Sequence, residues 1–583
     1  MPAPWAGRSR AARWPGDLVW LLPPFALGVF LRLWNLPAQV MGGDENHAVR
    51  VALGHDLGWI LTHYLPSDFS LPLTAVYRMM LAAGVTMTEM HFRLPPLAFG
   101  FALLLAAPWA VARCLEAVRP QEPGGAGWWR GRGGPASLAR PGGVILAVLL
   151  AVSPALALYS RVVRSYSAMV LLTFVAVAVF EIWWRTGRRR WAAVYAVAAG
   201  LALWFHLGSG PIVVAPFAWA GIAKLLRRRT DDGGPPPSWK ALVLVGVAAA
   251  AALATPQLPA WESLHAEVLT GKSIEQTVPV PTVAAAAALQ AGSREPAVVA
   301  AFWIAALAGL LLLARWRPDL AGFSAAAVGV HVVGLRVLSP LGLASPLILN
   351  RYLLPILPWV LLWVAVLLAA LWRLGASGTP AWLRWPARSA VVAALLGLVA
   401  AGPLVERPLR VSSFTHHNDL LVFIQNLAAA RQQVMPGIYH ELAAWDDGGA
   451  VLEVPWLDDF NANQTYYVYQ LVHGREVITG GPMHYVPDPR TALRNTVEMQ
   501  PQAFLASRAR WLVLHRRVGY EEDRLFQPTR WAAPSLPREW RRLLHYEGRR
   551  MARRLEREWG PPFRGGPLVS VWDLDAVRAR QAR

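Results

Sequence analysis

Apolar residues run along the first 400 positions in long, nearly continuous stretches. DLVWLLPPFALGVFLRLW, VILAVLLAVSPALALY and YLLPILPWVLLWVAVLLAALW are examples. Such runs approach or reach the roughly 20 residues with which a helix crosses about 30 Å of hydrocarbon. We therefore predict a polytopic α-helical membrane protein with about eleven transmembrane helices, at 17–35, 93–115, 142–158, 164–184, 191–207, 209–226, 240–257, 297–314, 319–338, 351–372 and 388–404.

Arginine clusters between these spans predict the topology. They lie at 119–140, 185–190, 227–240, 315–317 and 373–388, all on the side of the N-terminus. Short loops rich in Lys and Arg stay in the cytoplasm, so the N-terminus is predicted to be cytoplasmic. The odd number of spans then places the loops 36–92, 258–296 and 339–350 outside, together with the chain after about 405.

The pattern changes near residue 405 to mixed polar sequence with short apolar runs. AVLEVPWL, REVITGG, RWLVLHRR and PLVSVWDL are typical of strands, and NDLLVFIQNLAAARQQ is typical of a helix. We predict two regions: a transmembrane domain at 1–404 with a catalytic first outer loop at 36–92, and an extracytoplasmic soluble α/β domain at 405–583.

Composition changes this picture little. Of the residues, 55% are hydrophobic, and much of the net charge of +20 falls in the short loops, where it sets topology. We therefore expect membrane lipids and no nucleic acid as partners. The only cysteine, Cys114, lies in an apolar run, which leaves no cysteine-based metal site and no disulfide.

The first outer loop concentrates ionisable side chains: Asp44, Glu45, His47, His55, Asp56, His63 and Asp68. Adjacent carboxylates can serve as a general base with a proton partner or metal ligand, as a transferase needs to deprotonate an acceptor hydroxyl. A solvated pair of loop acids without a function is an equally good interpretation of this motif alone.

Further motifs follow at the outer ends of later spans. They are GGDENHA (42–48), SLPLTAVYRMM (70–80), TEMHFRLPPLAFG (88–100), YSRVVRSYSAMVLL (159–172) and RYLLPILP (351–358). In this order, over about 1–370, the chain resembles the GT-C glycosyltransferases. It is most similar to their protein mannosyltransferase and aminoarabinose transferase branch, of bacterial glycosyltransferase 39/83 type.

The resemblance implies an inverting enzyme of the bacterial inner (cell) membrane. Its donor would be a polyprenyl-phosphate-linked sugar, and its acceptor a lipid, glycan or protein on the extracytoplasmic side. Asp44 matches the family's proposed catalytic base, and Glu45 matches its partner. His47 would share a helical face with Asp44. Asp44 and Glu45 are also the candidates for a divalent metal site, which the sequence leaves open.

A phosphate leaving group needs a cationic site, and the planar guanidinium of arginine suits phosphate oxygens. Arg93, Arg161, Arg164 and Arg351 lie at predicted outer ends of spans, where topology does not explain them. Arg164 and Arg351 are favoured, with Tyr166 and Tyr352 as hydroxyl donors beside them. For each arginine, snorkelling or a structural ion pair is the alternative.

Two other residues are candidates for substrate binding. Asp68 stands near the position where the aminoarabinose branch often has a basic residue, and it would bind sugar or metal or only order the loop. His206, near the outer end of the fifth span, would reach the cavity or be a satisfied intramembrane histidine.

The C-terminal segment has aromatic and amide side chains near His473 that could contact sugars, although a structural domain explains them as well. The main alternative function is a multi-span transporter or flippase of a lipid-linked or anionic substrate. Transporters place ionisable residues near the middle of the bilayer, often in paired repeats. Here the charges collect at one face. A receptor-like membrane protein is the third interpretation.

Overall fold

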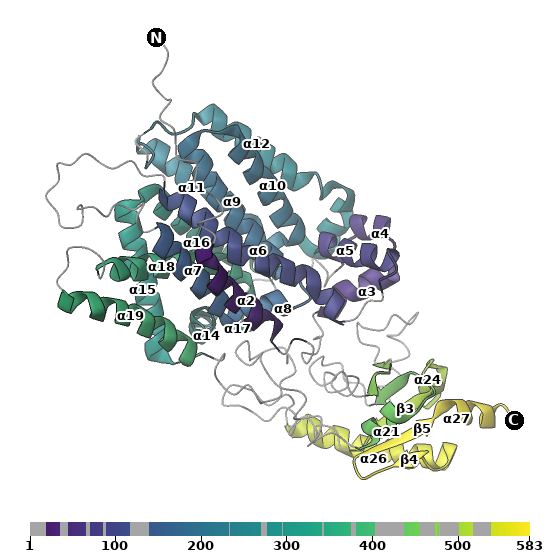
Figure 1. The fold of residues 1–583 in the computed structure, drawn as a ribbon. Helices are drawn as coiled ribbons and strands as arrows, with labels where there is room; N and C mark the ends of the chain where they lie inside the picture. Colours follow the sequence, from purple (N-terminus) through teal and green to yellow (C-terminus); the bar gives the residue numbers. More distant parts are fainter. Residues whose placement is uncertain are drawn as a thin grey trace.

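The structure is a computed structural model that describes residues 19–34, 36, 45–65, 70–85, 89–116, 139–231, 234–269, 277–293, 295–340, 343–344, 346–374, 381–402, 437–454, 473–475, 477–478, 501–516 and 538–583. The described residues between 19 and 402 form a helical bundle (Figure 1). Its long helices are α2 (Leu22–Leu33), α6 (Glu89–Glu116), α7 (Ala139–Val152), α9 (Tyr166–Thr186), α10 (Arg189–Phe205), α11 (Gly210–Leu225), α12 (Trp239–Ala254), α15 (Pro296–Trp316), α16 (Pro318–Leu338), α18 (Leu357–Leu374) and α19 (Ala381–Ala400).

Shorter helices join or extend these. They are η1 (Val19–Leu21), α3 (Asn46–Gly54), α4 (Leu57–Thr62), α5 (Leu71–Ala82), α8 (Pro154–Arg161), η6 (Leu207–Ser209), η7 (Leu258–Ala260), α13 (Trp261–Ser263), η8 (Leu264–Leu269), α14 (Val280–Ala291), α17 (Pro346–Leu353) and η9 (Leu354–Ile356). Helices α3, α4 and α5 lie together at one end of the bundle (Figure 1).

Helix α9 is the centre of the bundle, and it is packed against α6, α10, α11 and α16. Before Glu181 it is largely apolar on all sides, which is the pattern of a helix with neighbours on every side. Phe180 on α9 meets Tyr195, Phe217 and Phe323 edge to face at 4.9–5.5 Å between ring centroids. These contacts join four helices around one ring.

Each of the eleven predicted stretches forms a helix where the structure describes it. Within the described residues, five helices are long and apolar enough to cross a membrane, or up to seven if two bent pairs each count as one span, and four more are apolar but shorter. The chain is therefore mostly helical with several apolar helices. The count of eleven spans stays a prediction.

One of the stretches, 142–158, is bent where an uninterrupted span was predicted: helices α7 and α8 meet at 59°. A second bend, of 47°, lies between α12 and residues 258–266, just after the predicted span 240–257. The first bend falls at Ser153 and Pro154, where proline removes one backbone donor and serine caps the new helix. The predicted outer loop 258–296 also contains the apolar helix α14, which packs on α15 and α17.

A buried ion network joins three connections at one end of the bundle, which we call the basic end. Arg317 contacts Glu181 at 3.1 Å and Asp231 at 2.9 Å, and Arg185 contacts Glu181 at 2.6 Å. The backbone N–H of Asp319 donates to Asp231, and that of Asp231 donates to Asp319, each at 2.9 Å. Three of the five predicted arginine-rich connections thus meet at one end, while the common side of all five and the membrane side that this end faces stay predictions.

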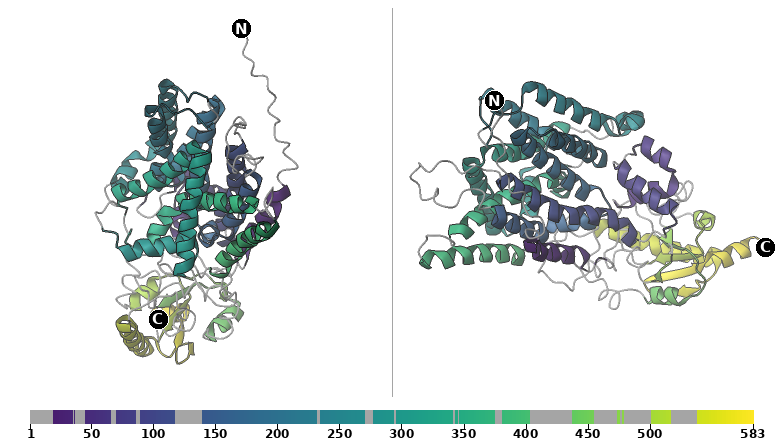
Figure 2. Two further views of the ribbon diagram at one scale, coloured as in Figure 1. Left: turned by 90° about the vertical axis from the view of Figure 1, so that its left-hand side faces the viewer. Right: turned by 45° about the horizontal axis from the view of Figure 1, so that its top comes forward.

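The described part of 437–583 contains a five-stranded sheet in the order β2-β1-β3-β5-β4. Its strands are β1 (Val451–Val454), β2 (Val477–Ile478), β3 (Trp511–His515), β4 (Arg564–Gly565) and β5 (Val569–Asp573). Strand β1 pairs in parallel with β2 and β3, and β5 pairs antiparallel with β3 and β4. The sheet lies beyond the end of the bundle that carries α3 (Figures 1 and 2).

Helices cover both faces of this sheet. The face of Leu452, Leu512 and Trp572 packs against α24 (Pro501–Ala506), α26 (Arg538–Trp559) and α27 (Leu574–Gln581). The face of Val451 and Val513 packs against α21 (Ile438–Ala444). The four predicted strand segments all contain strands, while the predicted helix at 418–433 lies outside the described residues. A separate extracytoplasmic domain stays a prediction.

His473 is buried beside α21, outside the membrane-spanning helices. Its ring stacks on Tyr439 at 5.9 Å, and its Nδ1 accepts a hydrogen bond from the backbone N–H of Arg475 at 3.1 Å. Burial, and secondly the charge of Arg475, lowers the pKa of His473 from 6.5 to about 4. The imidazole is therefore neutral in the folded protein at pH values at which an unfolded chain would protonate it.

We expect the C-terminal segment to lose stability as the pH falls from about 6.5 to 4. The unfolded state binds a proton at His473 in this range and the folded state does not, so the loss reaches about 3 kcal/mol for this group. Limited proteolysis of the full chain across this pH range measures it. His473→Gln should flatten the profile, and an unchanged slope in that variant would rule out His473 as its source.

Candidate active site

Asp44 and Asp68 lie outside the described residues, so their roles stay predictions. Glu45 is the first residue of the described segment 45–65 and directly precedes α3. Its side chain is fully buried and accepts a hydrogen bond from the backbone N–H of Val163 at 2.7 Å. The predicted acidic pair is therefore tied at its second member to the turn between α8 and α9, at the end of the bundle opposite the basic end. We call this end the site end.

Apolar packing fixes the same junction. Val163 is fully buried in a cluster with residues of α3, α5, α6 and α9, among them Ala52, Leu73 and Phe92. Tyr77 of α5 donates to the backbone carbonyl of Phe92 at 2.7 Å. The short helices α3 and α5 are thus docked on the long helices, which holds Glu45 in place.

Two predicted arginines join this cluster. Arg93, near the start of α6, and Arg161, the last residue of α8, are 1% and 0% exposed. The Arg93 Nε donates to the backbone carbonyl of Arg161 at 3.1 Å. Among the described residues, the charges of Arg93 and Glu45 lie within electrostatic reach of Arg161. A carboxylate and two guanidinium groups, from three separate parts of the chain, therefore share one buried cluster.

Tyr166, His206 and Tyr352 form the second half of the site, with Arg164 beside them. The His206 ring lies 5.5 Å from that of Tyr166 and 6.0 Å from that of Tyr352, and the Arg164 guanidinium lies 6.0 Å from the Tyr166 ring centroid. Tyr166 also meets Tyr159 of α8 at 5.0 Å. Side chains of α8, α9 and α17 and the α10–α11 connection thus converge here.

The orientation of His206 is set by the tight turn that follows α10. Its Nδ1 accepts a hydrogen bond from the backbone N–H of Gly208 at 3.1 Å. In the neutral ring the proton then lies on Nε2, so His206 offers a donor. A Cβ at position 208 would lie 3.0 Å from the imidazole, so any larger residue there would have to shift the His206 ring slightly.

His47 and Arg351 complete the predicted set. His47 lies in the first turn of α3 and is half-buried, and Arg351 lies in α17 and is 8% exposed. Tyr352 is held by its backbone, whose carbonyl accepts a hydrogen bond from Nε2 of His331 at 2.6 Å. Helix α17 thus brings Arg351 and Tyr352 to the site end.

Sequence reasoning missed two polar residues beside the site, Arg32 and Ser160. Both are buried, and the Arg32 Nε donates to the Ser160 Oγ at 3.2 Å. The signal was an arginine within the apolar run FLRLW, because ionisable residues within a span are functional candidates.

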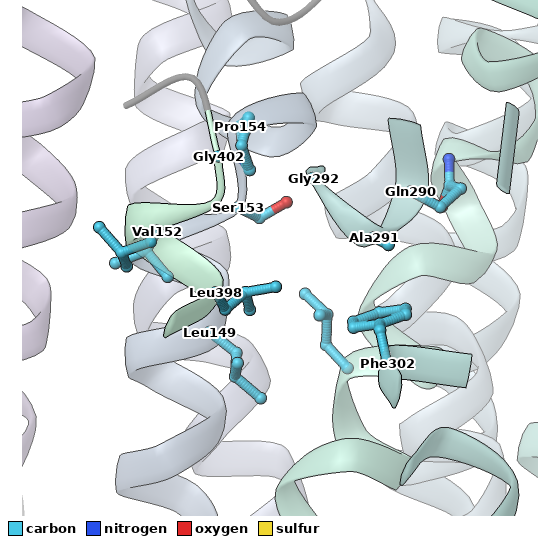
Figure 3. A pocket seen from close by; sticks show the side chains of 12 residues that line it. Leu149, Val152, Ser153, Pro154, Gln290, Ala291, Gly292, Phe302, Leu398 and Gly402 are labelled. Atoms are coloured by element: carbon cyan, nitrogen blue, oxygen red, sulfur yellow. The ribbon is translucent and has the colours of Figure 1, made fainter. Parts of the chain in front are cut away.

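A narrow cavity opens at the bend between α7 and α8 (Figure 3). Its walls come from α7, α14, α15, α18 and α19 and are mostly apolar, with Ser153 and Gln290 as the polar side chains. The charged groups described above do not line it. The charged cluster, rather than this cavity, is therefore the candidate site.

Metal binding was left open by the sequence. Among the described residues, no three His, Cys, Asp or Glu side chains are placed to hold a metal ion. Glu45 shares its cluster with Arg93 and Arg161, whose positive charges oppose a cation there. Glu45 therefore fits an ion-pair role better than a metal-ligand role, and Asp44 lies outside the described part.

The chain matches no protein-family profile and no curated protein. Among solved structures, the oligosaccharyltransferase AglB of Archaeoglobus fulgidus, in complex with an inhibitory peptide and a dolichol-phosphate, matches with 12% identity and a TM-score of 0.41, over 86% of this chain and 69% of that one. ArnT of Cupriavidus metallidurans matches in its apo state with 14% identity and a TM-score of 0.42, over 85% and 92%. With undecaprenyl phosphate bound, ArnT matches with 13% identity and a TM-score of 0.45, over 88% and 94%.

Proposed function

We propose that this chain is an integral membrane glycosyltransferase that moves a sugar from a polyprenyl-phosphate carrier to a lipid, glycan or protein acceptor. The observation that carries the proposal is the buried cluster of Glu45, Arg93 and Arg161. Its two guanidinium groups exceed the one carboxylate that is described there. A partly desolvated excess of arginine is suited to phosphate oxygens.

The proposed reaction is a single displacement with inversion. The acceptor oxygen attacks the anomeric carbon opposite the phosphate, while Asp44 takes the hydroxyl proton. The bond between the anomeric carbon and the phosphate oxygen breaks, and its electron pair leaves with the lipid phosphate. The guanidinium groups stabilise the charge that develops on that oxygen.

The other residues of the site would orient the substrates. His206 offers its Nε2–H to a sugar hydroxyl or phosphate oxygen, and Tyr166 and Tyr352 flank it. Arg164 and Arg351 are further cations at the same end of the bundle, and we assign them to the binding of the lipid phosphate. Glu45 balances the arginines and fixes the α8–α9 turn through Val163.

The two ends of the bundle also support a proposal for the orientation of the protein in the membrane. We propose that the site end faces the extracytoplasmic side of the bacterial inner membrane and that the basic end faces the cytoplasm. Three arginine-rich connections meet at the basic end, which supports a cytoplasmic position for it by the positive-inside rule. The C-terminal sheet lies beyond the site end, where it could contact an acceptor (Figure 1).

Mass spectrometry of envelope glycans and lipid carriers tests the function in cells with and without the gene. We expect deletion to remove one sugar from a glycan, glycolipid or glycoprotein and to raise the amount of the matching polyprenyl-phosphate sugar. Reintroduced wild-type protein should reverse both changes. Accumulation of a lipid-linked sugar on the cytoplasmic leaflet alone would favour a flippase and contradict the proposal.

A further inference from the structure

The bend between α7 and α8 lies next to the proposed phosphate site, and its geometry requires stabilising contacts. The last carbonyls of α7 have no partner within their own helix, and Pro154 cannot donate to them. Arg32 of α2 supplies donors instead. Its Nη2 donates to the carbonyl of Leu150 at 3.2 Å, and its Nη1 donates to that of Ala151 at 3.4 Å and to that of Gly28 at 3.0 Å.

Arg32 also reaches across the bend to α8. Its Nε donates to the Ser160 Oγ at 3.2 Å, and that hydroxyl donates to the Leu156 carbonyl at 2.6 Å. One guanidinium group thus binds the end of α7 and the last turn of α8 together. The planar, multidentate fork of arginine allows this, and the ammonium of lysine does not reproduce it.

Gly100 of α6 makes room for this contact. A Cβ at position 100 would lie 2.3 Å from the Ser160 Oγ and 3.5 Å from the Arg32 Nε. We call Arg32, Ser160 and Gly100 the α8 brace. Any side chain at position 100 would have to move the last turn of α8 away from α6.

Among the described residues, no carboxylate neutralises the charge of the Arg32 guanidinium. Its side chain is fully buried, and within the described part of the chain it forms no salt bridge. The carbonyl end of α7 provides the compensating partial negative charge. A buried cation is expensive in a bilayer and is a functional candidate for that reason.

We infer that Arg32 is a positioning residue for the phosphate site, acting through the α8 brace on Arg161. Ser160 directly precedes Arg161, whose carbonyl accepts from Arg93, and Glu45 binds Val163 two residues later. The end of α8 is therefore held by Arg32 on one side and by Arg93 and Glu45 on the other. This inference rests on the proposed function, because it assigns Arg161 to the donor phosphate.

The test uses purified full-length protein in nanodiscs and undecaprenyl phosphate as the probe. Arg32→Lys, Ser160→Ala and Gly100→Ala should each weaken binding by about tenfold and raise the KM for the lipid donor, with the KM for the acceptor unchanged. Hydrogen exchange at 154–163 should become faster. Gly329→Ala in α16 is the matched control, because no atom lies within 4 Å of its added Cβ, and it should bind as the wild type does.

A second control distinguishes weaker binding caused by a displaced Arg161 from weaker binding caused by lower stability of the whole protein. Ser324 of α16 is buried and accepts a hydrogen bond from Trp363 at 3.0 Å, so Ser324→Ala lowers stability away from the brace. If Ser324→Ala weakens binding as much as Ser160→Ala at a similar loss of Tm, the positioning role is overturned. The same holds if all three brace variants bind as the wild type does.

Arg161→Gln distinguishes this inference from the proposed function. If Arg161→Gln binds undecaprenyl phosphate as the wild type does, the phosphate site itself is wrongly placed. If Arg161→Gln loses binding while the brace variants keep it and show unchanged exchange, only the role of Arg32 is wrong. Weaker binding in Arg161→Gln and in the brace variants, with unchanged binding in Gly329→Ala and Ser324→Ala, supports both the phosphate site and the role of Arg32.

Discussion

Asp44→Asn is expected to lower the rate of sugar transfer by about 10²- to 10⁴-fold, the contribution of a well-placed general base. Asparagine has nearly the same shape as aspartate but cannot accept the proton of the acceptor hydroxyl. Asp44 directly precedes Glu45, whose side chain is held by Val163, so the substitution leaves that anchor in place. The loss should therefore appear in kcat, with little change in affinity for the lipid donor.

A matched control is available in the same loop. Asp56 is exposed and caps α4 by accepting a hydrogen bond from the backbone N–H of Trp59 at 2.8 Å. Asparagine caps helices as well as aspartate, so Asp56→Asn should keep both fold and rate. Transfer assays on the purified variants, at equal protein amounts, make the comparison. If Asp44→Asn retained more than about a third of the wild-type rate, Asp44 would not be the base.

The sequence was sufficient to place the long helices because a run of about 20 apolar residues has few alternatives. The stretch predicted at 319–338 is α16 at Pro318–Leu338. The bend between α7 and α8 was not predicted, although Ser153 and Pro154 mark it. Apolar composition continues through the bend, and the bent geometry depends on Arg32, which is far away in sequence.

The site, too, could be predicted from the sequence only in part. Arg93, Arg161 and Tyr166 could be chosen from the sequence because each lies at the predicted outer end of a span. Their contacts could not be predicted, since Glu45 and Val163 are 118 positions apart. Arg32 lies three residues from the predicted end of the first span, where an arginine is typical of a side chain that reaches the interface. Only the contacts of Arg32 with α7 and α8 distinguish a positioning residue from an arginine that reaches the interface.

Glu45→Gln is expected to have the second large effect, on stability and rate together. The amide oxygen of glutamine can still accept the hydrogen bond of Val163, so the variant removes the charge and keeps the contact. Arg93 and Arg161 would then be buried without this carboxylate, and removing one member of a buried charged group costs about 3–5 kcal/mol. Thermal unfolding of the purified protein should show a lower Tm, and the transfer rate should fall with it.

The same substitution makes the cluster more positive, and a phosphate ligand should partly replace the missing charge. We therefore expect undecaprenyl phosphate to raise the Tm of Glu45→Gln more than that of the wild type, because ligand binding to the folded state adds to its stability. Glu262→Gln, at an exposed glutamate of α13, is the control and should behave as the wild type does. A merely destabilised variant would gain no more from the lipid phosphate than the wild type. That outcome would show that Glu45 has no influence on the phosphate site. A larger gain in Tm would show that the Glu45 carboxylate and the donor phosphate interact with the same arginine side chains.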